Sequence, residues 1–123
     1  MAQKTYFGAK EILHNMDYEA ISVTVDKTTT GTVTENGRTI LKAGTILAGD
    51  GASIFTDRTK KVKKSTVETA ADGVLLHDVD ITDADSAAAL VYRGTLREDR
   101  VNDGTVSDAY KALLKHIQFV KGV

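Results

Sequence analysis

Short apolar segments with the two-residue period of β-strands, separated by turns that contain glycine, constrain the fold of this chain most strongly. In residues 20–25, branched apolar side chains alternate with polar ones, which is typical of a half-buried strand. Asn36 and Gly37 both tolerate the positive φ angles of a type I′ hairpin turn. The sequence therefore predicts a hairpin with strands at about 32–35 and 38–41.

Further apolar segments predict additional short strands, and a single segment near the C-terminus predicts a helix. Ser107 is a suitable N-cap, and the apolar residues after it follow helical spacing. Together, the predicted strands and the single helix favour a mainly β fold, a small β-barrel or sandwich with one short C-terminal helix. The other predicted strands cover residues 45–47, 53–55, 74–81, 87–97 and 117–120.

The composition limits the class of protein. With 123 residues the chain favours one domain, and 41% hydrophobic against 27% charged residues argues against wholesale disorder. The absence of cysteine excludes disulfides, thiolate catalysis and cysteine-based zinc sites. A net charge of -1 argues against direct nucleic-acid binding. Because no signal-peptide core or long apolar run is present, we expect intracellular production and no membrane partner.

The N-terminal segment fits neither the helical nor the strand period. We interpret residues 1–18 as an extended arm and residues 19–123 as a single β-rich domain. A short edge strand followed by a turn is the alternative for the start of the chain. The apolar side chains of this arm that could contact a partner are Tyr6, Phe7, Ile12 and Leu13.

Neither the acidic residues nor the histidines match a catalytic or metal-binding pattern. A calcium loop that begins at Asp78 would need glycine where Asp83 stands and glutamate where Ala89 stands. The three histidines, His14, His77 and His116, are too far apart in sequence to form a spaced ligand motif. We therefore predict no catalytic residue, no metal site and no cofactor.

The basic residues between Arg58 and Lys64 form the most distinctive charged feature of the sequence. Residues 56–66 are polar and basic, which predicts a mobile surface loop. No aromatic residues are interleaved for base stacking, which argues against single-strand binding. Contact with an acidic protein surface is the functional alternative.

Four segments, in order and spacing, resemble the head decoration proteins of tailed bacteriophages, of the lambda-like head-stabilising type. Residues 40–48 contain a lysine-x-glycine strand-turn, and residues 73–81 an apolar run followed by acidic residues. An alanine-rich lead into a strand follows at 87–96, and a helix and strand at 107–121. The resemblance extends over residues 20–121.

The resemblance implies a structural protein and not an enzyme. Such proteins bind the major capsid protein on the outer surface of the mature head as homotrimers, so the expected location is the virion after synthesis in the host cytoplasm. An N-terminal arm that becomes ordered on the shell is also implied, and Tyr6, Phe7, Ile12 and Leu13 would be its capsid contacts.

Two other functions stay open from the sequence. A head-fibre or host-surface-binding module would use exposed loops such as residues 49–66. A small ligand-binding β-barrel, or an enzyme on such a barrel, would need a pocket with convergent polar groups, for which His77 is the candidate.

Overall fold

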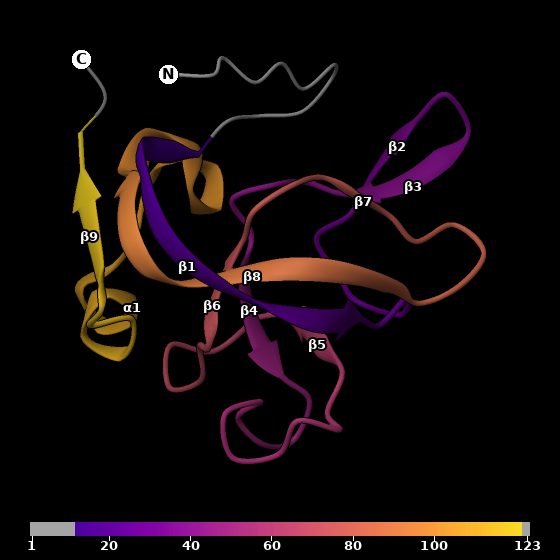
Figure 1. Cartoon of the computed structure of the whole chain (residues 1–123). Helices are drawn as coiled ribbons and strands as arrows, with labels where there is room; N and C mark the ends of the chain where they lie inside the picture. Colours follow the sequence, from indigo (N-terminus) through magenta and orange to yellow (C-terminus); the bar gives the residue numbers. More distant parts are fainter. Residues whose placement is uncertain (1–11, 122–123) are drawn as a thin grey trace.

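The computed structural model describes residues 12–121, except for the side chains of residues 13–17 and 103. Within this range the chain is mainly β, with one short α-helix and two 3-10 helices (Figure 1), which confirms the predicted fold class. In chain order the elements are β1 (Leu13–Val25), β2 (Val33–Glu35), β3 (Arg38–Leu41), β4 (Ile46–Gly49), β5 (Val62–Lys64), β6 (Gly73–Leu75), β7 (Val79–Asp80), β8 (Ser86–Arg97), η1 (Glu98–Arg100), η2 (Asn102–Gly104), α1 (Asp108–Leu113) and β9 (Ile117–Val120).

Five strands pair in a closed ring and form a small barrel. The order within the larger sheet is β1-β5-β4-β6-β8-β9, and β1 also pairs with β8. The β1–β8 pairing is antiparallel and long, whereas β1 meets β5 in parallel at one residue pair, Val25 and Val62. Strand β9 lies outside the ring and pairs in parallel with the end of β8 (Figure 1).

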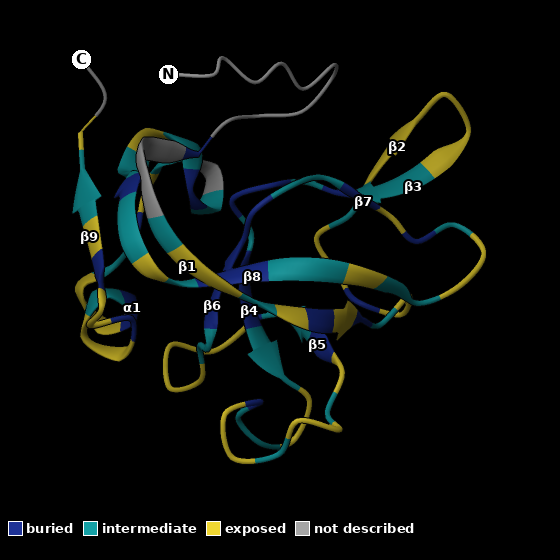
Figure 2. Cartoon of the chain, viewed as in Figure 1, coloured by how far each residue is buried: buried dark blue, intermediate teal, exposed yellow. Residues whose placement is uncertain are grey.

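Consecutive apolar residues in β4, β6 and β8 are explained by burial on both faces of these strands (Figure 2). One core cluster takes side chains from all five barrel strands and so fills the barrel interior. The other lies among α1, β9 and the segment 98–106. Strands covered on both faces lose the polar alternation of a half-exposed strand. The inward residues are Leu47, Leu75 and Leu90, and their outward neighbours are Ile46, Val74 and Val91.

A second, three-stranded sheet, β2-β3-β7, carries a hairpin that projects from the barrel (Figure 1). Asn36 has a φ of 52° and Gly37 a φ of 76°, which are the positive values that a type I′ turn requires. The hairpin predicted from these two residues is confirmed. Its strand β3 pairs with β7 through Ile40–Asp80 and Leu41–Val79.

The single α-helix begins where the sequence predicts it. The Ser107 side chain accepts a hydrogen bond from the Tyr110 amide at 3.4 Å, which caps the first turn. Tyr110 is buried, and its hydroxyl lies 3.0 Å from the hydroxyl of Ser65, which ties α1 to the barrel. Among residues 12–121, no helix combines the length and the apolar composition needed to cross a bilayer.

Three local predictions were wrong. Residues 53–55 form a turn and not a strand. The segment 74–81 is not one continuous strand, because β6 ends at Leu75 and β7 starts at Val79. Residues 56–66 are not wholly a loop, since they contain β5. In each case long-range contacts decide the local conformation, and these contacts are not visible in the local pattern.

Candidate functional site

Two of the four predicted contact residues of the N-terminal arm, Ile12 and Leu13, lie within the described residues. Tyr6 and Phe7 lie outside the described residues. Ile12 is completely buried in the outer core cluster, and its carbonyl accepts a hydrogen bond from the Arg97 amide at 2.9 Å. Leu13 starts β1, which extends through the part predicted as arm up to residue 18. Ile12 therefore packs in the core of its own chain, whereas the sequence predicts an accessible side chain there.

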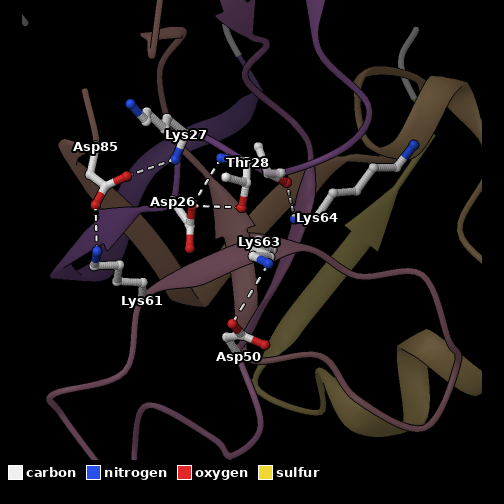
Figure 3. Close-up of polar contacts among 9 residues, drawn as sticks. Asp26, Lys27, Thr28, Asp50, Lys61, Lys63, Lys64 and Asp85 are labelled. Atoms are coloured by element: carbon white, nitrogen blue, oxygen red, sulfur yellow. Dashed lines mark hydrogen bonds and ion pairs between the residues drawn. The ribbon is translucent and has the colours of Figure 1, made fainter. Parts of the chain in front are cut away.

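The basic segment is organised by ion pairs and backbone contacts (Figure 3). The Lys61 ammonium pairs with Asp85, and the Lys63 ammonium lies 3.6 Å from a carboxylate oxygen of Asp50. The Lys64 amide donates to the hydroxyl of Thr29 at 2.8 Å. Exposed ion pairs contribute little stability individually, and the position of β5 in the barrel wall is set by its pairing with β4 and β1.

Two carboxylates that directly precede strands, Asp78 before β7 and Asp85 before β8, serve as structural braces. Asp85 accepts from Lys61 and from the Lys27 amide, and these contacts lower the pKa of its carboxyl group (Figure 3). Asp78 accepts from the Ala43 amide at 2.7 Å and pairs with Lys42 at 3.1 Å. The same pair, with a second contact from a glutamate, raises the pKa of Lys42. Through these contacts, Asp78 and Asp85 hold neighbouring loops in place.

The structure also places the histidines. His14 lies in β1, where its side chain is not described, and His116 directly precedes β9. His77 is half-buried in the connection between β6 and β7. Within the described part of the chain, no three potential ligand side chains gather in a way that could hold a metal ion.

One side of the domain carries a groove of about 820 Å³. It lies where β8 changes neighbour: Val91 pairs with Val74 of β6, and Gly94 pairs with Ile117 of β9. Four segments line this groove: residues 48–55, residues 69–72, Tyr92 with Arg93, and residues 113–116. A volume of this size is typical of ligand-binding clefts. The alternative of a ligand-binding barrel places its pocket around His77, which does not line this groove.

A carboxylate braces the loop that forms one wall of the groove. Asp72 accepts hydrogen bonds from the Gly49 amide at 2.8 Å, the Ser53 hydroxyl at 2.8 Å and the Ile54 amide at 3.1 Å. Ile54 is buried, with 1% of its surface exposed, and anchors the same loop in the barrel interior. The neighbouring Phe55 is thereby held on the surface, with 49% exposed.

An aromatic pair continues this wall onto the sheet. The rings of Phe55 and Tyr92 meet edge to face, with centroids 5.6 Å apart. Such pairs add a modest stabilisation beyond the area that they bury. The Tyr92 hydroxyl donates to a carboxylate oxygen of Glu19 at 3.2 Å, which fixes the ring from its other end. The wall is therefore apolar and preformed.

Two basic side chains, Lys115 and Arg93, also line the groove and form its cationic rim. Lys115 and His116 are exposed between α1 and β9, and no ion pair of either is found among the described residues. Arg93 lies beside them in the lining, with its Nε 3.7 Å from a carboxylate oxygen of Glu19. The one carboxylate of the lining, Asp72, already accepts three hydrogen bonds. The groove thus combines an apolar wall with a cationic rim.

Sequence reasoning did not identify this groove. It assigns Phe55 to a strand and Leu113 to the buried face of a helix, yet both are exposed beside the groove. The four lining segments are distant in sequence, and no local pattern signals that they meet. Neither the models of known protein families nor the curated protein sequences contain a match to this chain.

Proposed function

We propose that this chain is a structural decoration protein of a bacteriophage capsid. In this proposal it binds the major capsid protein on the outer surface of the mature head as a homotrimer, after synthesis in the host cytoplasm, and stabilises the shell. The role is one of assembly and involves no catalysis.

The observation that carries the proposal is the place of the resembling segments in the fold. The four segments include all of β6 and β9 and most of β4 and β8, and these strands are consecutive neighbours in the larger sheet. The segments are residues 40–48, 73–81, 87–96 and 107–121. Segments that are separate in sequence thus form one continuous structural unit. A resemblance spread over a single unit supports a common fold better than scattered matches would.

The use of polar side chains in the barrel is also compatible with an assembly role. Asp72, Asp78 and Asp85 accept hydrogen bonds from backbone amides of distant segments, which stiffens the loops around the barrel. A rigid domain loses little conformational entropy when it binds. Because contacts repeat over many copies on a shell, modest stabilisation at each site adds up across the head.

Co-sedimentation with phage heads tests this proposal. The full chain would be mixed with expanded, undecorated heads of the phage that encodes it and, separately, with its immature shells. A variant that lacks residues 1–11 leaves Ile12 and β1 in place, so it removes none of the buried residues that the structure describes. We expect saturable binding to expanded heads only, weakened by the truncation. Absence of binding to both shells would contradict the decoration function.

A further inference from the structure

We infer that the groove beside β8 binds a short peptide segment of a partner protein that carries a large apolar side chain next to acidic residues. This inference goes beyond capsid decoration and does not depend on it. It follows from the apolar surface, the charge and the position of the groove, each of which is independent of the resemblance.

The apolar surface of the groove exceeds what the fold itself needs. Phe55 is 49% exposed and Leu113 is 39% exposed, and both line the same groove, so the exposed apolar surface is gathered in one concave place. Between them the lining consists of small residues, which leave the space open. These small residues are Ala48, Gly51, Ala52, Ala70 and Ala71. A large apolar side chain of a ligand would fill that space and cover both exposed residues.

The basic side chains at the rim determine which residues the ligand can carry next to its apolar side chain. Lys115 lines the groove without a described ion-pair partner, and Arg93, the second basic residue of the lining, shares the Glu19 carboxylate with Tyr92. An acidic residue in the ligand would pair with these groups, whereas a basic residue would be repelled. Charge complementarity therefore favours an acidic segment.

The chain's own N-terminal segment does not fit this description. Residues 1–11 contain two lysines, Lys4 and Lys10, and one acidic residue, Glu11, which leaves a net charge of +1 from the side chains. A second copy would bring this basic segment to a cationic rim. This charge argues against residues 1–11 as the occupant, and we assign the groove to an acidic segment of a different protein.

An extended peptide suits the position of the groove. The groove lies at the point where β8 passes from its pairing with β6 to its pairing with β9. Strand ends and loops surround the site, and the loop wall is fixed by Asp72. A preformed groove of this kind accepts an extended segment with side chains that alternate between the groove and the solvent.

Nuclear magnetic resonance titration of the full chain tests the inference with two capped synthetic peptides. One has the sequence Asp-Leu-Phe-Glu, and the other, Lys-Leu-Phe-Lys, keeps the apolar residues and reverses the charge. We expect the acidic peptide to shift the amide signals of Ala52, Leu113 and Lys115 in a saturable way. The basic peptide should bind at least about fivefold more weakly, the effect of one favourable charge contact.

Two pairs of variants separate the groove from the rest of the surface. Leu113→Ser and Lys115→Glu should each weaken the acidic peptide about fivefold or more. Their matched controls, Val67→Ser and Lys121→Glu, change equally exposed residues outside the groove lining and should leave affinity within about twofold. All four sites are exposed, so thermal melting should show folded proteins.

Three results would overturn the inference: equal binding of both peptides, signal shifts that map away from the groove, or no binding of the acidic peptide. Because no phage shell is present in this experiment, such a failure would leave the decoration proposal standing. Conversely, if the chain does not bind phage heads, binding of the acidic peptide would still support the groove inference.

Discussion

At the scale of single residues, Gly73 shows how closely β6 approaches β8. A Cβ atom at this position would lie 2.5 Å from the Val91 carbonyl oxygen and 2.6 Å from a methyl carbon of Leu90. The carbonyl belongs to the backbone and cannot rotate away. We therefore expect Gly73→Ala to lower the free energy of unfolding by about 1–3 kcal/mol, as overpacking of a core does, measured by urea denaturation.

Gly37 provides the matched control for this substitution. A Cβ atom there would meet nothing within 4 Å, so only its φ of 76° disfavours a side chain. Gly37→Asn keeps a residue that tolerates this conformation and should cost only a few tenths of a kcal/mol, roughly. If Gly73→Ala unfolds at the same urea concentration as the unchanged protein, the packing of β6 against β8 is looser than the structure indicates.

The acidic residues show where single-residue reasoning from sequence stops. A calcium loop at Asp78 can be rejected from the sequence alone, because the motif requires particular residue types at fixed spacing. The bracing role of Asp72 cannot be derived in that way. Its partners Gly49 and Ile54 are 23 and 18 residues away, so only the fold brings their amides to its carboxylate.

At the scale of elements, the attachment of the β2–β3 hairpin to β7 depends on an ionised carboxylate. Asp80 accepts from the Arg38 guanidinium at 2.8 Å and from the amide and hydroxyl of Thr82. The contact with Arg38, followed by those with Thr82, lowers the pKa of Asp80 from 3.8 to about 2. Since the folded state holds the charged form, this stabilisation is present above pH 3.8 and is lost as the pH falls toward 2.

Asp80→Asn tests this attachment through its pH dependence. At pH 7 we expect the variant to melt at a lower temperature than the unchanged protein. The difference should shrink as the pH falls below about 4 and become small near pH 2, where Asp80 is protonated in the unfolded state and about half protonated in the folded state. Thermal melting followed by circular dichroism measures it. Glu68→Gln removes an exposed carboxylate with no described ion pair and should leave the melting temperature nearly unchanged. A difference in melting temperature that is as large at pH 2 as at pH 7 would contradict the role of the charge.

Elements with complete local signals were predictable from the sequence. The hairpin turn at Asn36-Gly37 needs two residues that accept positive φ, and the helix after Ser107 needs a cap and an apolar stripe. Both signals lie within a few residues. Strand β5 has no such signal, because Val62 is the single apolar residue in a basic segment. Its strand conformation comes from Val25 and Gly49, which pair with Val62 from distant parts of the chain.

At the scale of the whole molecule, the barrel and its outer layer share the same strands. Because β4, β6 and β8 are covered on both faces, they connect the barrel interior to the layer of α1 and β9. The apolar runs of these strands are visible in the sequence, but the second covering layer is not. The groove lies where β8 passes from β6 to β9, at the edge of the layer formed by α1 and β9. Because this layer is not visible in the sequence, the groove could not be predicted, although the strands could.

The same architecture predicts an uneven stability within one domain. Strands β1 and β8 share a long antiparallel register, with Val23 and Leu90 in the barrel interior. The hairpin, by contrast, has three exposed residues in β2 and joins the rest of its sheet through the two residue pairs of β3 and β7. Backbone hydrogen bonds that lie on the surface, with little apolar cover, open locally before the whole molecule unfolds.

Native-state hydrogen exchange measures this difference. We expect the amides of β1 and β8 that pair between residues 20–25 and 86–91 to exchange only through global unfolding, with the free energy that urea denaturation gives. The amides of the β2–β3 hairpin should exchange through local opening at a much lower free energy, nearly independent of low urea concentrations. The paired strands provide the internal control. Equal exchange free energies in both regions would show that the hairpin and the barrel unfold as one cooperative unit.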